Sequence, residues 1–302
     1  MINAQSKPQK ITKAVIPAAG FGTRFLPWTK AMTKGMLPIV DKPVVQIAVE
    51  QLAEAGIKEI YIVISPDSKD KPIFNHFQPN KPLETQLIKA GKEKELKIIK
   101  DLESLAKLHY VYQTNKDPYG NGTPIFLAAK YIKDEPFIYM WADEFVLAEP
   151  PVLRQILTAY ENYGGSFMTT IRATKDEDYK RYGFVAGEKI SPGVIKIEEV
   201  IEKPGKEKAP SDLATISPFI FQPSIVEAIL EARKQLIDNK ELYYNDAIKL
   251  LLKKEPFYAV EIRNYRYFDT GNKLEYLKTV VEFGLKDKEF GKKFRQFLVD
   301  LV

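Results

Sequence analysis

A glycine-bearing turn followed by basic residues is the part of this sequence best suited to chemistry. Gly20 and Gly22 come directly after a short apolar segment, and Arg24, Lys30 and Lys34 follow them. Glycines let backbone N–H groups approach a ligand without a Cβ in the way. Arginine and lysine supply the positive charge that phosphate groups need. The combination predicts a nucleotide-phosphate site, whereas a glycine pair by itself is equally typical of a tight structural turn.

The elements that must position these residues alternate between strand and helix. Residues 59–64 form an apolar run that is typical of a strand buried on both faces. Residues 42–55 carry apolar side chains at helical spacing, and Gly56 marks a C-terminal stop. Strand–helix–strand repetition predicts a parallel sheet with crossover helices. The other expected strands are residues 13–16, 109–112 and 137–141, and the other expected helix is 123–132.

Two parts of the chain depart from this alternation. Residues 85–108 are charged and helix-prone, which predicts an inserted pair of helices or a flexible flap over a site. Beyond Gly164, short strands separated by turns precede helical stretches. One α/β unit with a C-terminal helical cap is the simplest organisation. The expected strands are 166–172, 183–185, 194–199 and 215–221, and the helical stretches are 226–253 and 272–302.

Composition argues against several classes of protein. The 302 residues carry a formal net charge of +5, but the basic residues are spread out, so no nucleic-acid partner is expected. The lack of cysteine excludes disulfides and thiolate metal sites, and two histidines argue against a zinc site or a Ser-His-Asp triad. No apolar run approaches the ~20 residues of a membrane helix, and residues 1–11 do not resemble a signal peptide. We therefore expect a cytoplasmic protein with no membrane partner.

The glycine turn belongs to a longer series of motifs. The chain reads GFGTRFLPWTK from Gly20, TKGMLP from Thr33 and VDKP from Val40. This order resembles the signature of the nucleotidyltransferases that activate sugar 1-phosphates, and most closely the bacterial-type UTP–glucose-1-phosphate uridylyltransferases. The resemblance extends through nearly the whole chain. It implies a Rossmann-like, mostly parallel mixed sheet flanked by helices, with a small β insertion and C-terminal helices.

The resemblance implies a nucleotide site built on two glycine-bearing loops. Arg24 and Lys34 would neutralise the triphosphate. Gln113 follows a strand, as does the family's Gln that reads the pyrimidine edge, and an amide both donates and accepts as the uracil imide requires. Gly120 and Gly122 are also explained by a generic turn. The residues implied to bind the nucleotide are Ala19, Gly20, Gly22, Thr23, Gln113, Gly120 and Gly122.

The resemblance also implies Mg²⁺ as a cofactor. Asp143, in Trp-Ala-Asp-Glu, occupies the position of the family's metal-binding Asp at the end of a strand. A carboxylate there can bind Mg²⁺ while phosphates fill the remaining positions. Asp269, in Asp-Thr-Gly-Asn-Lys, matches an Asp that lies near the metal or the phosphates in relatives. From residue type alone, Asp143 is also typical of a turn and Asp269 of a loop or helix cap.

Two further motifs resemble those of the family's sugar site. Tyr-Gly-Phe-Val around Gly183 matches Tyr-Gly-Val-Val, and Val-Ile-Glu-Lys-Pro around Glu202 matches Val-Val-Glu-Lys-Pro. The resemblance implies that Glu202 accepts hydrogen bonds from sugar hydroxyls and that Lys203 holds the sugar phosphate. A solvent-exposed ion pair in a charged region is the alternative for these two residues.

The implied reaction joins UTP and glucose 1-phosphate to give UDP-glucose and pyrophosphate. It needs positioning and charge neutralisation more than acid–base groups, because its nucleophile is already an anion. Arg24, Lys34 and Lys203 would supply the positive charge. Relatives commonly form a homodimer or homotetramer. We expect one nucleotidyltransferase domain over residues 1–302, comprising a flexible N-terminus (1–11), a nucleotide-binding half (12–165), a sugar-binding half (166–270) and C-terminal helices (271–302).

Four departures from the family pattern leave the substrate pair open. Gly35 stands where the family has Glu. Thr123-Pro124 stand where the family usually has His or Asp and then Ala, and the approach to the second glycine pair is two residues longer. Ser217-Pro218-Phe219 replaces Gly-Arg-Tyr, and Tyr243 replaces Gln. The alternatives are a thymidylyltransferase, an enzyme for another sugar 1-phosphate, and a non-catalytic nucleotide-sugar sensor. A dinucleotide-binding oxidoreductase is disfavoured because the third glycine of its fingerprint is missing.

Overall fold

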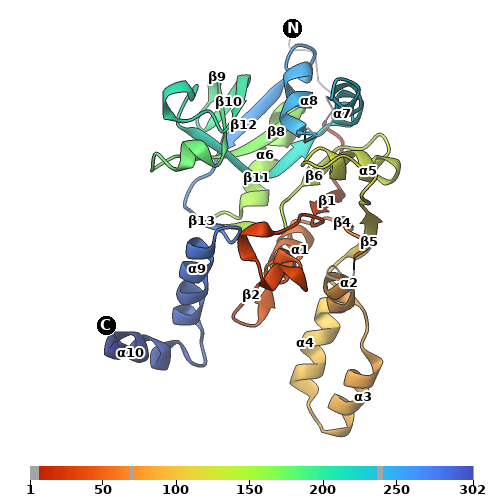
Figure 1. The fold of residues 1–302 in the computed structure, drawn as a ribbon, viewed down its shortest axis with the longest axis vertical. Coiled ribbons are helices and arrows are strands. Elements are labelled where there is room, and N and C mark those ends of the chain that lie inside the picture. Colours follow the sequence, from red (N-terminus) through yellow and green to blue (C-terminus); the bar gives the residue numbers. More distant parts are fainter. Residues whose placement is uncertain (1–6, 68–70, 237–240, 302) are drawn as a thin grey trace.

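A mixed nine-stranded sheet forms the centre of the computed structural model, which describes residues 7–67, 71–236 and 241–301 (Figure 1). In the described residues its strands lie in the order β5 (Lys107–Tyr112), β4 (Glu59–Ile64), β1 (Lys13–Pro17), β6 (Phe137–Tyr139), β11 (Leu213–Phe221), β8 (Ser166–Arg172), β12 (Phe257–Glu261), β10 (Val194–Glu202) and β9 (Gly183–Ser191). β9 also pairs with β11. All of these strands run in one direction except β10 and β11. The mostly parallel mixed sheet expected from the sequence is confirmed.

Helices cover both faces of the sheet, because successive side chains of a strand point to opposite faces. In β4, Ile60, Ile62 and Ile64 join the core on one face, and Tyr61 and Val63 join the core on the other. Burial on both faces explains the apolar runs from which the strands were predicted. The first face packs against α1 (Val44–Glu54) and α6 (Val152–Tyr163), and the second against α5 (Thr123–Ile132), α7 (Ser224–Lys234) and α8 (Tyr244–Leu251).

A third, smaller apolar core lies where segments from distant parts of the chain meet. It contains Phe25, Phe145 and Phe268, and the rings of the last two are stacked with centroids 4.8 Å apart. Phe25 directly follows Arg24, and Phe268 directly precedes Asp269. Packing of these aromatic rings therefore positions candidate site residues that the sequence separates widely. The two-stranded ribbons beside this core are β2 (Pro38–Ile39) with β3 (Lys42–Pro43) and β7 (Glu144–Ala148) with β13 (Tyr265–Asp269).

Two helical arms project from one end of the sheet domain (Figure 1). The first contains α2 (Lys71–Phe77), α3 (Lys81–Lys89) and α4 (Glu93–Glu103), so the inserted pair of helices is confirmed and begins earlier than predicted. The second contains α9 (Lys273–Lys286) and α10 (Gly291–Leu301), and the C-terminus lies beside α10. The helical stretch predicted over 272–302 is therefore interrupted between α9 and α10.

Several boundaries differ from the predictions. The stretch 226–253 contains two helices, α7 and α8, and its residues 237–240 lie outside the described residues. The patterns of α6, β7, β12 and β13 were not recognised. Residues 1–6 also lie outside the described part. Ile11 is buried and the carbonyl of Gln9 accepts a hydrogen bond from Tyr160 at 2.8 Å, so these two residues pack against the domain, and the flexibility expected for residues 1–11 stays a prediction. No helix in the described residues is long and apolar enough to cross a membrane.

Candidate active site at the strand ends

A cavity of about 330 Å³ opens where β1, β5 and β6 end. The carboxyl ends of parallel strands meet at one edge of a sheet, which is where ligands of such folds bind. β11 runs past the end of β6 and pairs there with the beginning of β9, so the second half of the sheet reaches the same cavity. The predicted site residues that line it are Ala19, Gly20, Arg24, Lys34, Gln113, Gly120, Asp143, Gly183, Glu202, Lys203 and Asp269.

Gly22, Thr23 and Gly122 lie outside this lining and shape the loops around it. Gly22 has φ +64°, in the left-handed region that favours glycine. The hydroxyl of Thr29 donates to the carbonyl of Gly22 at 2.8 Å and holds the turn closed. Thr23 begins the 3-10 helix Thr23–Phe25. Direct contact of these three residues with a nucleotide stays a prediction.

Lys34 and Asp143 form an ion pair on the wall of the cavity. Lys34 begins the 3-10 helix Lys34–Met36, and Asp143 lies between β6 and β7. Burial acts to lower the pKa of Lys34, but the charge of Asp143 and its hydrogen bond outweigh burial, so the pKa is raised. The lysine therefore stays protonated. The hydroxyl of Thr270 donates to the backbone carbonyl of Asp143 at 2.7 Å and connects this wall to the turn after β13.

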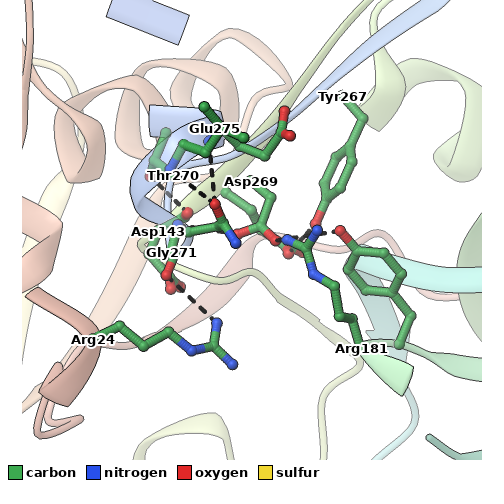
Figure 2. Close-up of polar contacts among 12 residues, drawn as sticks. Arg24, Asp143, Arg181, Tyr267, Asp269, Thr270, Gly271 and Glu275 are labelled. Atoms are coloured by element: carbon green, nitrogen blue, oxygen red, sulfur yellow. Dashed lines mark hydrogen bonds and ion pairs between the residues drawn. The ribbon is translucent and has the colours of Figure 1, made fainter. Parts of the chain in front are cut away.

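Asp269 is the centre of a second polar cluster (Figure 2). Its carboxylate pairs with Arg181 and accepts hydrogen bonds from the Tyr182 hydroxyl at 3.2 Å and the Gly271 N–H at 3.0 Å. Burial raises the pKa of Asp269, and the positive charge of Arg181 opposes that rise only in part. Arg24 approaches the same turn from the other side, with Nη1 3.4 Å from the Gly271 carbonyl oxygen.

The carboxylates of Asp143 and Asp269 converge on Gly271. A Cβ on Gly271 would lie 2.8 Å from Oδ2 of Asp143 and 3.1 Å from Oδ1 of Asp269. Glycine thus leaves a space bordered by two carboxylates. In the described residues no group of three or more His, Cys, Asp or Glu side chains is placed to hold a metal ion, so an ion here would need further ligands from a substrate. Asp269 does not cap α9, because that helix is capped by the side chain of Asn272.

Glu144 is a partly buried carboxyl group to which the sequence motifs assigned no role. Its Oε1 accepts a hydrogen bond from the N–H of Ser217 at 2.8 Å, and its Oε2 accepts one from the hydroxyl of Tyr267 at 2.6 Å. Burial raises the pKa of Glu144 to about 7, although these two hydrogen bonds favour the charged form. A register shift in β11 between Ile216 and Phe219 brings Ser217 to this position. Ser217, one of the departures from the family pattern, therefore holds the side chain of Glu144, the residue next to Asp143, through a hydrogen bond.

Glu202 and Gly183 lie opposite each other at the paired ends of β10 and β9. The Asn245 amide donates to Oε2 of Glu202 at 2.7 Å, and burial raises the pKa of this carboxyl. A Cβ on Gly183 would lie 2.8 Å from the Thr215 hydroxyl and 3.1 Å from Glu202, so glycine leaves room beside the carboxylate. Lys203 is half-exposed, with Nζ 3.6 Å from Oε1 of Glu202. A solvated ion pair does not account for the partial burial of Glu202 or for its bond to Asn245.

Gln113 begins the loop that leads to the second glycine pair. Its side-chain nitrogen lies 3.4 Å from a carbonyl oxygen of the same loop. The carboxylate of Asp117 accepts hydrogen bonds from the N–H and hydroxyl groups of Thr114, which closes the longer approach as a compact turn. Gly120 has φ +130°, and a Cβ there would lie 2.3 Å from a backbone oxygen of the segment before α8. Gly122 donates a backbone hydrogen bond to the same segment, so both glycines allow close packing of two backbones.

The other departures from the family pattern also lie at the cavity. Gly35, Pro124 and Tyr243 belong to its lining. A Cβ on Gly35 would lie 3.5 Å from the Cβ of Ala142, which is an ordinary van der Waals distance. Arg181 also lines the cavity, and the sequence motifs did not identify it. Its position directly before the Tyr-Gly motif could have indicated that it belongs to the site.

Comparisons with known proteins agree with this fold. Residues 13–283 match the Nucleotidyl transferase family. A UTP–glucose-1-phosphate uridylyltransferase of Bacillus subtilis is 38% identical over 97% of this chain and 98% of its own length. A Methanocaldococcus jannaschii protein that carries the same name provisionally is 42% identical over 97% of this chain and 99% of its own length.

Solved structures show the same likeness. A UDP-glucose pyrophosphorylase crystallised with UDP-glucose has a TM-score of 0.81 and 32% identity, covering 92% of this chain and 100% of that one. A UTP-bound UGPase from Acinetobacter baumannii has a TM-score of 0.85 and 28% identity, covering 97% of this chain and 100% of that one. The chain belongs to the nucleotidyl transferase family. Its predicted resemblance to UTP–glucose-1-phosphate uridylyltransferases is confirmed.

Proposed function

We propose that this protein transfers the uridylyl group of UTP to glucose 1-phosphate. An oxygen of the sugar phosphate attacks the α-phosphorus of UTP and forms a new P–O bond. The bond from that phosphorus to the bridging oxygen of the β-phosphate breaks, and pyrophosphate leaves with the electron pair. UDP-glucose is the other product. The protein has little covalent chemistry to perform, so catalysis consists of positioning and charge stabilisation.

One observation carries the proposal: a single cavity joins a basic glycine-turn wall to a wall that carries a partly buried Glu and a Lys. Arg24 and Lys34 belong to the first wall, and Glu202 and Lys203 to the second. A triphosphate on one side and a sugar phosphate on the other would each meet positive charge. Relatives named for UTP, glucose 1-phosphate and UDP-glucose support this particular pair of substrates.

On the nucleotide side, Arg24 and Lys34 would neutralise the triphosphate. The turn at Ala19 and Gly20 lets the backbone approach it, because a Cβ on Gly20 would meet no heavy atom within 4 Å. Gln113 would read the uracil edge with an amide that donates and accepts. Gly120 keeps the opposing loop close to the segment before α8.

On the sugar side, Glu202 would accept hydrogen bonds from hydroxyl groups in the space that Gly183 leaves open. The bond from Asn245 fixes one of its oxygens and leaves the other for a ligand. Lys203 would hold the sugar phosphate against the repulsion of the triphosphate. The half-exposed position of Lys203 allows its Nζ to move from Glu202 to a bound phosphate.

Asp143 and Asp269 fit a magnesium ion, because their carboxylates border the space beside Gly271 and such ions commonly take one or two carboxylates together with phosphate oxygens. Bound Mg²⁺ would neutralise charge that develops on the phosphates. Thr270 and Gly271 keep the two carboxylates in place through their hydrogen bonds to the Asp143 carbonyl and the Asp269 side chain.

The second arm supports a homodimer or homotetramer. Exposed apolar side chains occur along both of its helices, at Leu274, Leu277, Phe297 and Val299. Light scattering of the purified protein tests this part of the proposal: a monomer at micromolar concentration contradicts it.

Pyrophosphate release with different substrates tests the assignment. UTP with glucose 1-phosphate is expected to give a kcat/KM at least about 10-fold above dTTP, or above another sugar 1-phosphate. Comparable or faster turnover with dTTP would replace the uridylyl assignment by a thymidylyl one. Release of pyrophosphate from no pair would favour a nucleotide-sugar sensor.

A matched pair of lysine variants tests the sugar side. Lys203→Met is expected to raise the KM for glucose 1-phosphate by about 10- to 100-fold, because a charge-assisted hydrogen bond to the phosphate is lost. Lys196→Met removes an exposed lysine of β10, the strand that ends directly before Lys203, and this lysine lies outside the cavity lining, so the KM should stay unchanged. Equal KM values for the two variants would contradict the role of Lys203.

A further inference from the structure

Arg181 is a cavity residue to which neither the motifs nor the proposed reaction has assigned a role. The basic residues that line the cavity, within the described part of the chain, are Arg24, Lys34, Arg181 and Lys203. We propose that Arg181 is a second residue that binds the phosphate of the sugar 1-phosphate, and that Asp269 holds its guanidinium until a divalent cation takes that carboxylate. This inference rests on the proposed function.

The backbone places Arg181 beside Lys203. Gly183 and Glu202 are paired where β9 begins and β10 ends, and the N–H of Lys203 donates to the carbonyl of Tyr182 at 3.1 Å. The N–H of Arg181 donates to the carbonyl of Asp178 at 2.9 Å, which anchors the residue to the preceding 3-10 helix. Two cations therefore extend into one cavity from hydrogen-bonded segments. The planar fork of arginine can grip two phosphate oxygens at once, next to the single charge of lysine.

Each of the two cavity carboxylates is neutralised by one cationic side chain, so a divalent cation could replace both side chains without changing the net charge. Asp143 pairs with Lys34, and Asp269 pairs with Arg181. The carboxylate side chains are 15% and 14% exposed, and leaving them unpaired would cost free energy. One divalent cation beside Gly271 carries the same charge as the two side chains. Its binding would therefore leave both carboxylates neutralised and free Lys34 and Arg181 for the phosphates.

The remaining contacts of Asp269 allow Arg181 to leave without loss of the carboxylate's position. The Tyr182 hydroxyl and the Gly271 N–H still hold its two oxygens. The guanidinium also lies 5.3 Å from the centroid of the Tyr182 ring, so a cation–π contact supports it beside the cavity. Figure 2 shows Arg181 and Arg24 on opposite sides of the turn that carries Asp269. A phosphate in front of this turn would be reached from both sides.

Three variants test the proposal: Arg181→Gln, Arg181→Lys and the matched control Lys180→Gln, which removes an exposed charge one residue away. The first readout is the binding of Mn²⁺ to the nucleotide-free protein, which is measured through the electron paramagnetic resonance signal of Mn²⁺. Arg181→Gln should bind about threefold more Mn²⁺ than wild type at a limiting concentration, because the carboxylate has lost its competing cation. Lys180→Gln should match wild type.

The second readout is steady-state kinetics. Arg181→Gln should raise the KM for glucose 1-phosphate by about 10- to 100-fold and leave the KM for UTP within about twofold. Arg181→Lys should recover part of this loss, because it keeps the charge but not the fork. An unchanged KM for glucose 1-phosphate in Arg181→Gln would overturn the proposal, as would Mn²⁺ binding that stays equal or falls. The latter result is expected if Arg181 merely holds Asp269 in place.

A double variant separates this inference from the proposed function. Asp143→Asn with Asp269→Asn should abolish Mn²⁺ binding if the two carboxylates form the metal site. Mn²⁺ binding equal to wild type would refute that site and the exchange together, whatever the kinetics of Arg181→Gln. Loss of Mn²⁺ binding in the double variant, with unchanged binding and KM in Arg181→Gln, would keep the metal site and refute the role of Arg181.

Discussion

The cavity and the exposed Lys97–Asp101 pair of α4 use the same charged residue types under opposite conditions. In the arm, Lys97 and Asp101 of α4 pair with side chains that are 74% and 62% exposed, whereas Lys34 and Asp143 in the cavity are 32% and 15% exposed. Exposed charges keep their hydration, so such a pair contributes little to stability. Charges in the cavity lose hydration and need partners. The proposed substrates are polyanions, which explains why the cavity keeps charged side chains in spite of this cost.

The two regions also differ in how tightly each position constrains its neighbours. No residue of α4 is fully buried, and apart from Leu102, which packs against the core, its exposed side chains can be replaced without changing a packed core. The turn at Gly271 contacts Asp143, Asp269 and Arg24 at once. A single added methyl group there would displace a carboxylate. We therefore expect substitutions in the cavity to change turnover by orders of magnitude, and substitutions of exposed α4 side chains to leave turnover and stability nearly unchanged.

The largest effect is expected for Asp143→Asn. The variant keeps the size of the side chain but removes the charge beside Gly271, and pyrophosphate release should fall by about three orders of magnitude. Asp101→Asn makes the same change in the arm and should retain wild-type turnover. Thermal unfolding of both variants checks that the fold is intact. Undiminished pyrophosphate release in Asp143→Asn would show that the metal site has been placed wrongly.

Gly271→Ala should separate function from stability. Its Cβ would lie 2.8 Å from Oδ2 of Asp143, but that atom is the end of a side chain and can move. The free energy of unfolding should therefore change by less than about 1 kcal/mol, while turnover falls by about 10- to 100-fold because a carboxylate is displaced. Urea unfolding and pyrophosphate release measure the two effects. A variant with full turnover would mean that the space beside Gly271 is not used.

His76 lies at the base of the arm and should give a smaller, pH-dependent effect. Partial burial lowers the pKa of His76 below its usual value, and its Nε2 lies 2.8 Å from the side-chain oxygen of Gln46. A depressed folded-state pKa means that its contribution to stability is complete above the unfolded-state pKa of about 6.5. That contribution is lost as the pH falls through the folded-state value.

His76→Gln removes this titration and keeps a hydrogen-bonding side chain. Between pH 7.5 and 5.5, the melting temperature of the variant should fall less than that of wild type. The unfolding free energies of the two proteins should therefore differ more at pH 5.5 than at pH 7.5. Identical melting curves at both pH values would contradict the direction of the shift.

The smallest effect is expected for Lys97→Met. Loss of the pair with Asp101, whose charged atoms lie 2.9 Å apart, should change the unfolding free energy by less than about 0.5 kcal/mol and leave turnover unchanged. Chemical denaturation measures the first quantity and pyrophosphate release the second. A loss above 1 kcal/mol would place the arm's ion pairs in the same energetic class as those of the cavity, against the comparison made above.

Much of the fold was predictable because its signals are local. The apolar run of residues 59–64 predicted β4, and the charged helix-prone stretch predicted the arm that α3 and α4 form. The missed β7 and β13 are short, and their aromatic residues Phe145 and Phe268 become a core only when they stack on each other. Five residues with mixed aromatic, charged and apolar side chains are too few to show a clear periodic pattern.

The site was predictable in part for the same reason. Arg24, Lys34, Asp143 and Lys203 stand in motifs, and all four line one cavity. Arg181 and Glu144 stand beside motif residues, but no motif assigned either of them a role. Their properties come from neighbours supplied by other elements, such as Asp269 beside Arg181 and Tyr267 beside Glu144.

The sequence by itself determined the alternating strands and helices, the glycine-bearing turns and the types of charged residue near them, because backbone freedom, apolar periodicity and charge are properties of single residues and short segments. Tertiary structure alone decided which charges face each other, how deeply they are buried and that Asp143 and Asp269 share the space beside Gly271. Those features depend on distances between segments that only the packed core brings together, and on burial, which sets the free energy of each charge.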